Sequence, residues 1–396
     1  MSDYLEDNKN SSSLKAWQRF TDNLNAAGET IIGQFGAANA RERAEGFRYL
    51  TRLLSIGLDL HLEHADPQYP TFTRMINDTR KFIGDNPDAT YDYASLNCEV
   101  SYLITGQRGI SDYLGFCLYG VDEQGKPSVG ANAGDDKIQF AEDGSFELYI
   151  AKTNDLQHSN FLAMDENTNS LVVRQYFTGD RSQAGTYAIK TVSNVAPKAQ
   201  LDEALLSQQL KNVSDFVEEI STSSSVLSIF AGLNAVSLDK GDQHEVLEVR
   251  GAEMDARGRP SAEELAGKID PASIALHMPT PDIQYSGCWW ELAEDEAVVI
   301  SGKKLDCRYW SIQIFSRWME SPDYRYNQVS INNSDVSFEE DGSFKVYLCA
   351  HNPGFKNWIS TDGFHNGQVC FRALLADVAP EVHYKVEKID RLLDSQ

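Results

Sequence analysis

The sequence is poor in positive charge and lacks long apolar runs. Its 396 residues include 35 lysines and arginines against 59 aspartates and glutamates, which gives a formal net charge of −24. A chain this acidic does not attract a phosphate backbone or an anionic lipid surface, so we expect neither nucleic acid nor a membrane as a partner. No apolar run approaches the roughly 18 residues of a membrane-spanning helix. The polar, acidic N-terminus does not resemble a signal peptide.

Motifs for cofactors and metals are also lacking. The six cysteines form no C-x-x-C pair, and there is no phosphate-binding loop, dinucleotide fingerprint or G-x-S-x-G elbow. We therefore expect no cofactor and no metal site. Most cysteines lie in or beside apolar, strand-like stretches, which predicts reduced, buried thiols in a cytoplasmic protein. A disulfide between Cys349 and Cys370 is the minor alternative.

Helical periodicity occurs in two parts of the chain. Apolar residues recur every three to four positions near the N-terminus, most clearly between Phe47 and Leu62, so we expect helices over 14–32, 43–62 and 72–83. His61 and His64 lie near the end of the second helix, where a solvated helix end is a simpler explanation than a metal site. Further helices are expected over 201–235 and, behind a capping box, over 261–268.

Two regions with strand-like, period-two alternation are copies of each other. The turn Asp143-Gly144-Ser145 recurs as Asp341-Gly342-Ser343, and both are typical of hairpin turns. The offset between the copies stays between 194 and 198 residues. Further matched pairs are Asn160 with Asn357, Arg174 with Arg372, and Tyr187 with Tyr384. Two copies this long indicate a domain duplication and not a solenoid.

These patterns predict an α+β protein with two related antiparallel β-sandwich-like domains. We expect an N-terminal helical region over 1–86 and a first β domain over 87–198, which is the more degenerate copy. A helical linker over 199–270 and a second β domain over 271–396 complete the chain.

The second copy resembles the family known as domain of unknown function 1214. The residues that carry the resemblance are Tyr309-Trp310-Ser311, the hairpin Asp341-Gly342-Ser343, Asn357-Trp358 and Arg372. The likeness covers about 285–384 well and the first copy weakly, because Leu114 and Phe161 replace the two tryptophans there. The resemblance implies a β-sandwich-like fold and carries no settled activity, so function has to be argued from the residues.

The second copy also differs from the first in a way that suggests a site. Five of the six tryptophans lie in it, and His351 stands where the first copy has Thr153. A larger core explains any single tryptophan well, whereas five in one domain favour an aromatic-lined pocket. A duplicated domain needs only one working site, so we expect no site in the first copy.

Strand alternation separates an apolar face from a mixed face in the second copy. Trp310 lies on the apolar phase of its strand. A mixed face of this kind is either a covered ligand site or a face capped by the chain itself, and the sequence leaves both open. The residues on the mixed phase are Tyr309, Ser311, Gln313, Tyr347, Cys349, His351, Cys370 and Arg372.

We expect His351, Arg372, Tyr309 and Tyr347 to converge on one cavity of the second domain. His351 and Tyr347 are the candidate catalytic residues, because histidine is suited to acid–base chemistry at neutral pH. Arg372 would hold an anionic or carbonyl group, although Arg174 in the first copy favours a structural role. The candidate substrate-binding residues are Tyr309, Trp310, Gln313, Trp358 and Arg372.

Three functions remain open at this point. The first is a cofactor-independent enzyme or binder for a small, partly apolar molecule, such as an isomerase, hydratase or lyase. The second is a carbohydrate-binding protein, which requires exposed tryptophans. The third is a structural or oligomer-assembly protein without a catalytic site, whose tryptophans lie in the core or at an interface and whose partner is another copy of the chain.

Overall fold

The computed structural model describes residues 11–33, 39–233, 277–378 and 380–395. The short helix expected over 261–268 and much of the expected linker lie outside these residues. The chain forms two compact units. The first comprises Met1–Phe82, Thr90–Gln175 and Gln183–Ser223, and the second comprises Ile83–Ala89, Tyr176–Ser182 and Ser224–Gln396. The second unit thus includes Tyr176–Ser182 of the first copy and Ile83–Ala89, which spans the predicted start of that copy at residue 87.

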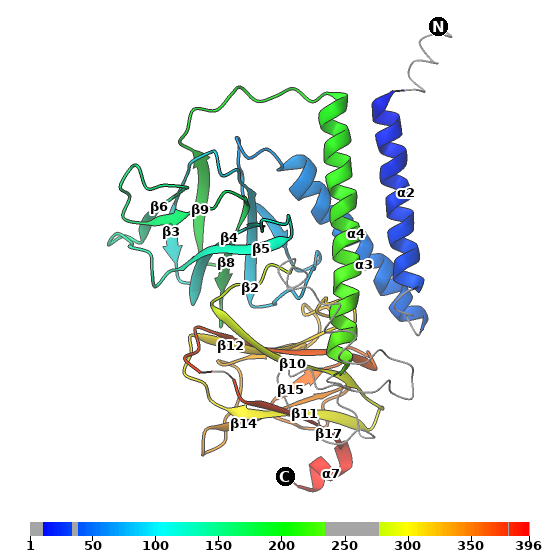
Figure 1. The fold of residues 1–396 in the computed structure, drawn as a ribbon. Coiled ribbons are helices and arrows are strands. Elements are labelled where there is room, and N and C mark those ends of the chain that lie inside the picture. Colours follow the sequence, from blue (N-terminus) through cyan, green and yellow to red (C-terminus); the bar gives the residue numbers. More distant parts are fainter. Residues whose placement is uncertain (1–10, 34–38, 234–276, 379, 396) are drawn as a thin grey trace. The chain divides into compact units, whose positions relative to one another are not determined.

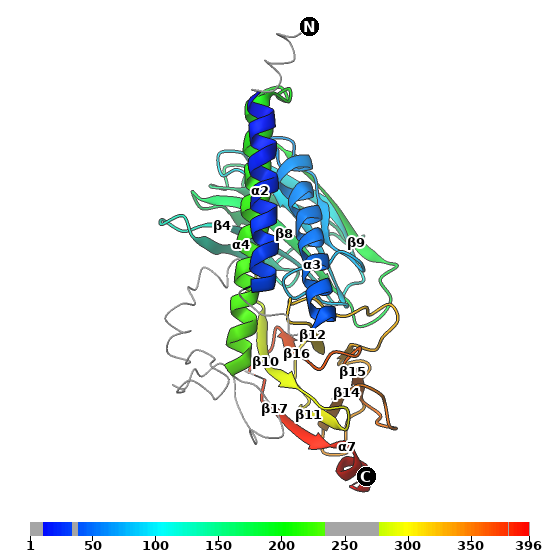
Figure 2. The ribbon, with the colours of Figure 1, turned by 90° about the vertical axis from the view of Figure 1, so that its right-hand side faces the viewer.

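Three helices lie side by side in the first unit (Figures 1 and 2). They are α2 (Ser12–Gly33), α3 (Ala40–Leu58) and the first part of α4 (Glu203–Leu233). The Asn39 side chain caps α3 by accepting a hydrogen bond from the Glu42 N–H at 3.0 Å. Phe20 of α2 and Val213 of α4 are buried in the apolar cluster that joins these helices. This packing stabilises the helices beyond their intrinsic propensity.

The third expected helix, over 72–83, is wrong. Thr73–Ile76 forms strand β1, which pairs antiparallel with β2 (Ala89–Ser95). The side chain of Asn77 accepts hydrogen bonds from the N–H groups of Thr79 and Arg80 at 3.0 and 2.8 Å. This Asx turn stops the strand and offers the backbone an alternative to a helix.

Each unit contains a sandwich of two sheets. In the first unit the sheet orders are β1-β2-β8-β4-β5 and β7-β6-β3-β9. β3 pairs antiparallel with β6 and β9, and β4 pairs antiparallel with β5, whereas β6 and β7 are parallel. The strands are β3 (Tyr102–Gly109), β4 (Tyr113–Val121), β5 (Pro127–Gly134), β6 (Ser145–Ala151), β7 (Phe161–Ala163), β8 (Thr168–Tyr176) and β9 (Ala184–Thr191).

The second unit repeats this topology strand for strand. Its sheet orders are β10-β16-β12-β13 and β15-β14-β11-β17, which become those of the first unit when each strand number is lowered by eight and β1 is left out. The parallel pair recurs as β14 and β15. The strands are β10 (Ile283–Glu291), β11 (Glu296–Lys303), β12 (Tyr309–Phe315), β13 (Ser330–Asn332), β14 (Ser343–Cys349), β15 (Trp358–Ser360), β16 (Asn366–Leu374) and β17 (Val382–Lys388), followed by helix α7 (Ile389–Asp394).

Matched polar residues of the two copies make the same contacts. The Asn160 side chain donates to the carbonyls of Gln139 and Glu147 at 2.8 and 2.9 Å and accepts from the Gln139 N–H at 2.7 Å. The Asn357 side chain donates to the carbonyls of Ser337 and Lys345 and accepts from the Ser337 N–H at the same three distances. The duplication predicted from sequence is therefore present in strand order and in detail.

The two Asp-Gly-Ser turns are also alike, with φ of 80° at both Gly144 and Gly342. In each turn the aspartate side chain accepts from the serine N–H at 2.9 Å. These aspartates form turns, as the sequence predicts.

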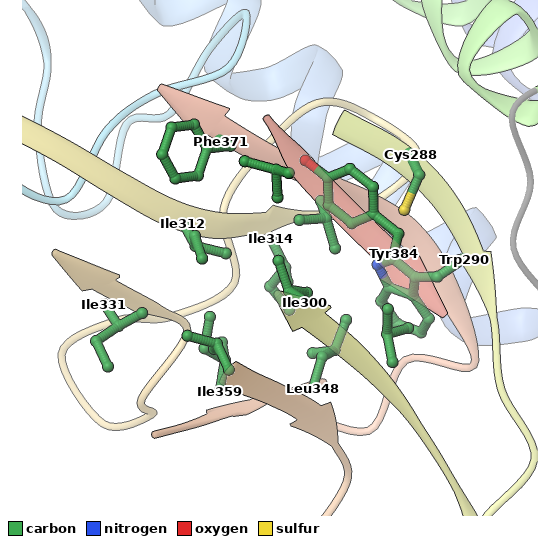
Figure 3. Close-up of a cluster of buried hydrophobic side chains, with 14 of the residues drawn as sticks. Cys288, Trp290, Ile300, Ile312, Ile314, Ile331, Leu348, Ile359, Phe371 and Tyr384 are labelled. Atoms are coloured by element: carbon green, nitrogen blue, oxygen red, sulfur yellow. The ribbon is translucent and has the colours of Figure 1, made fainter. Parts of the chain in front are cut away.

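The core of the second unit lies between its two sheets (Figure 3). Ile312 and Ile314 come from one sheet, and Ile300 and Leu348 come from the other. Trp310 is 1 % exposed and stacks on Phe344 and Phe371 at 5.0 and 5.3 Å between ring centroids. The equivalent core of the first unit is also closed by strands of both sheets.

Candidate functional site

The structure places the predicted site residues in three separate locations of the second unit. Tyr309 and Gln313 on β12 and Arg372 on β16 face away from the core of the sheet β10-β16-β12-β13. Trp310 points into the core. The remaining residues, Tyr347, His351 and Trp358, belong to β14, the turn after it, and β15 of the other sheet.

The expectation that His351, Arg372, Tyr309 and Tyr347 converge on one cavity is therefore wrong. β14 pairs with β11 and β15, and it does not belong to the sheet that holds β12 and β16. Alternation along a strand shows which residues share a face of that strand. It does not show which of the two sheets of a sandwich the strand joins.

The segment Ile83–Ala89 covers the outer face at Arg372. The guanidinium donates hydrogen bonds to the carbonyl of Gly84 and, at 3.5 Å, to that of Asp85. The Gln313 amide donates to the same Asp85 carbonyl at 2.5 Å, and its oxygen accepts from Arg372 at 3.4 Å. We call the five residues Gly84, Asp85, Gln313, Ser321 and Arg372 the Arg372 clamp.

Ser321 is the clamp residue that binds the carboxylate of Asp85. This side chain is fully buried and accepts from the Ser321 N–H at 2.8 Å and from the Ser321 hydroxyl at 2.6 Å. On the same side, the Gly84 N–H donates to the carbonyl of Met319 at 2.8 Å. The loop between β12 and β13 thus fixes the segment from one side while Arg372 and Gln313 fix it from the sheet.

A second polar group lies at the other end of the segment. The buried Tyr309 hydroxyl donates to a carboxylate oxygen of Asp88 at 2.9 Å, and the Asn332 amide donates to the same oxygen at 3.2 Å. Asn86 donates to the Tyr309 hydroxyl at 3.0 Å. Burial raises the pKa of Asp88, and the two hydrogen bonds oppose that shift in part. Burial, together with the nearby Asp88, also raises the pKa of Tyr309, which keeps its hydroxyl protonated.

The surroundings of the clamp arginine recur in the first copy. The Arg372 guanidinium carbon lies 5.8 Å from the ring centre of Tyr285 and 5.5 Å from that of Phe315. In the first unit the same carbon of Arg174 lies 5.7 Å from the ring of Tyr91 and 5.5 Å from that of Tyr119. These four rings occupy matching strand positions, so stacking between two aromatic rings is a shared structural feature of the duplicated domain.

Two residues with strained backbone adjoin the clamp. Ile83 and Met319 have φ of 42° and 53°, in the left-handed region that bulky side chains avoid. Each of these two backbone conformations costs about 1–2 kcal/mol of stability. The buried hydrogen bonds of Gly84, Asp85 and Ser321 offset this cost, so the backbone conformation is held from both sides.

The segment and the β12–β13 loop are the functional-site residues that the sequence analysis missed. In the first copy the matching stretch is a long hairpin of β4 and β5, which turns at Gly125 with φ of 78°. In the second copy the stretch contains Trp318 and Pro322 and no such turn glycine. This difference between the two copies points to the β12–β13 loop. The comparison of the copies does not point to Asp85, because Asp85 lies outside both repeats.

The other predicted residues form a small aromatic cluster. Tyr347 stacks on Phe355 with 4.0 Å between ring centroids, and Trp358 donates its indole N–H to the Cys349 carbonyl at 3.2 Å. Ile389 and Leu392 of α7 pack against this cluster. The side chain of His351 is exposed, and its carbonyl accepts from the Cys349 thiol.

Other polar candidates also have structural partners. Asp59 forms an ion pair with Arg80, and His64 shares a hydrogen bond of 2.7 Å with Thr71. His61 lies against Phe216, and burial lowers its pKa to about 4. In the described ranges, no three His, Cys, Asp or Glu side chains are grouped as a metal site requires. All six cysteines are free thiols.

The fold and these contacts define a class of protein with two tandem β-sandwiches of identical strand order, the second completed by a clamped segment. Residues 291–377 match the model of a family described as "Protein of unknown function (DUF1214)". A crystal structure of an uncharacterized protein from Burkholderia cenocepacia is 30% identical with a TM-score of 0.80, and the match covers 95% of this chain and 97% of that one. The chain therefore belongs to this family of unknown function.

A more distant likeness is to the VPA0106 protein from Vibrio parahaemolyticus. It is 13% identical with a TM-score of 0.46, over 85% of this chain and 97% of that one. No curated protein matches the sequence. Among the helices in the described part of the chain, none is long and apolar enough to cross a membrane.

Proposed function

We propose that the chain is a structural or oligomer-assembly protein without a catalytic site. The observation that carries this proposal is the Arg372 clamp. The polar side chains that would bind or transform a substrate on this face instead hold Ile83–Ala89, and Asp85, Gln313 and Arg372 are at most 5% exposed. A substrate would have to displace a segment of the protein's own chain to reach them.

The chemistry of the clamp also supports a structural role. Three hydrogen bonds of Arg372 end on two backbone carbonyls and one amide oxygen, which are neutral acceptors fixed by the fold. An arginine with the same aromatic neighbours occurs in the first copy, where sequence suggests no site. His351, the candidate acid or base, lies on the other sheet and is exposed.

The two alternatives have less support. A carbohydrate-binding surface in the second copy needs exposed tryptophans there, whereas Trp290, Trp310 and Trp318 are at most 1% exposed and Trp358 is only partly exposed. A small-molecule site on the mixed face needs space that Ile83–Ala89 fills. Six free thiols suit a reducing compartment, so we propose a cytoplasmic location.

Sedimentation velocity on the full-length chain tests the proposal. We expect reversible assembly into dimers or larger species at micromolar concentrations, the range in which an interface of ordinary size associates. A chain that remains monomeric throughout the micromolar range would contradict an assembly role.

A further inference from the structure

We propose that two copies of the chain associate through the three-helix layer of the first unit, with α3 of each copy against α4 of the other. This inference rests on the proposed assembly function and names its surface and partner. The observations that carry it are the opposite charges of α3 and α4 and the apolar side chains that the layer leaves exposed.

The exposed side of α3 is basic in an otherwise acidic protein. Over Ala40–Leu58 the helix has four arginines and two glutamates, and one of those glutamates, Glu42, is buried. Arg48 has half of its side chain exposed, although it lies 3.4 Å from Glu45. Phe47 lies beside it and is 44% exposed. Arginine next to an exposed aromatic ring is typical of the energetically important centre of a protein interface.

The exposed side of α4 is acidic. Between residues 202 and 220 the chain has five carboxylates and one lysine. Asp215 forms an ion pair with Lys211 one helical turn before it, and Glu219 lies one turn after it, where the two like charges of Asp215 and Glu219 repel each other. Burial raises the pKa of Glu219, and the charge of Asp215 adds to that shift. Arginines supplied by a partner would relieve this repulsion.

The third helix, α2, supplies the middle of the layer. Figure 2 shows α2 in front of α4, with α3 to one side of it. Trp17 on α2 is 52% exposed and Leu205 on α4 is 38% exposed, so every helix of the layer leaves a large apolar side chain accessible to water. Single exposed apolar side chains are common on protein surfaces, so these count here only together with the opposite charges of α3 and α4.

A second copy is the partner that fits both charges at once. A two-fold axis along this layer brings α3 of one copy to α4 of the other, and the same contact recurs on the opposite side of the axis. A foreign acidic protein would match α3 and leave the carboxylates of α4 facing like charge. Such an isologous contact closes as a dimer and does not propagate into a filament.

Charge reversal on the full-length chain tests this surface by sedimentation velocity. We expect Arg48→Glu and Glu219→Lys each to weaken the dimer by about tenfold or more, since each places like charges in contact. The double variant, which exchanges the two charges, should recover most of the wild-type affinity. Lys190→Glu, on the exposed edge of β9, is the matched control and should leave the affinity unchanged. Circular dichroism verifies that each variant is folded.

The outcomes separate this inference from the proposed function. A wild-type chain that assembles while both single variants keep its affinity would refute the α3–α4 contact and leave the assembly role standing. A wild-type chain that is monomeric would refute both. Loss of affinity in the single variants without recovery in the double variant would show that the two residues do not face each other and would overturn the pairing.

Discussion

Asp88 is a partly buried carboxylate of the second unit whose hydrogen-bond donors are neutral. Tyr309 and Asn332 donate to it, and burial raises its pKa above the ordinary value. A carboxyl group whose pKa is higher in the folded than in the unfolded state makes its whole contribution to the free energy of unfolding at pH values below its pKa in the unfolded state. That contribution is lost as the pH rises through the folded value.

We therefore expect Asp88→Asn to remove a pH-dependent penalty. At pH 7 the variant should be as stable as the wild type, within about 0.5 kcal/mol, or more stable, because the amide oxygen can accept the same two hydrogen bonds. Its free energy of unfolding should also vary less with pH above the ordinary carboxyl pKa of about 4. Urea unfolding at several pH values measures this.

Asp341→Asn is the matched control with the opposite sign. Hydrogen bonds from Ser343 lower the pKa of Asp341, so its contribution is present above the unfolded pKa and is lost as the pH falls through the folded one. This variant should be less stable than the wild type at pH 7 and equal to it in strong acid. A large loss of stability in Asp88→Asn at pH 7 would mean that a cation holds the Asp88 carboxylate.

For single residues, the sequence predicts which face of a strand a side chain lies on better than it predicts which side chains meet in a site. Alternation correctly puts Tyr309, Gln313 and Arg372 on one face and Trp310 in the core. It cannot show that Tyr347 and His351 lie on the other sheet, because the pairing partner of a strand is decided by distant residues. It also cannot show that Asp85, outside both repeats, completes the face.

At the scale of elements, the equivalence of the two copies can be measured. Asn160 joins β6, and Asn357 joins β14, to the preceding loop through three hydrogen bonds. Alanine at either position leaves buried backbone groups without these partners. We expect Asn160→Ala and Asn357→Ala each to lower the free energy of unfolding by about 2–3 kcal/mol.

The two asparagine variants serve as controls for each other. Urea denaturation followed by tryptophan fluorescence reports mainly on the second unit, and circular dichroism reports on both. A similar loss in both variants supports a common structural role. A loss in one copy only would contradict the equivalence of the two sandwiches.

Elements with strong local signals are predicted well, and those without them are not. α4 and the Asp-Gly-Ser hairpins follow from periodicity and turn chemistry. The region 72–83 has helix-like spacing, yet pairing with β2 makes Thr73–Ile76 a strand and the Asn77 turn ends it. The loop between β12 and β13 has no local signal, since its shape depends on Asp85, more than 200 residues earlier in the sequence.

At the scale of the whole molecule, duplication explains most of the architecture. Two sandwiches of identical strand order account for the repeated motifs, and the helices of the first unit account for the remaining apolar periodicity. The composition predicts a chain that avoids nucleic acid and lipid, but composition alone does not identify a partner. The proposed partner depends on how the charges of α3 and α4 are distributed in the folded first unit.

We infer that the polar face of the second unit is part of the scaffold and is not a gated active site. Hydrogen exchange measured by mass spectrometry tests it most directly, because the N–H groups of Gly84 and Ser321 are bonded inside the clamp. We predict that peptides covering 83–89 and 316–321 exchange as slowly as β12 and β16, and that Arg372→Ala accelerates the first of them. Rapid exchange of 83–89 in the wild type, with β12 and β16 still protected, would show a segment that opens over a protected sheet and would contradict the account.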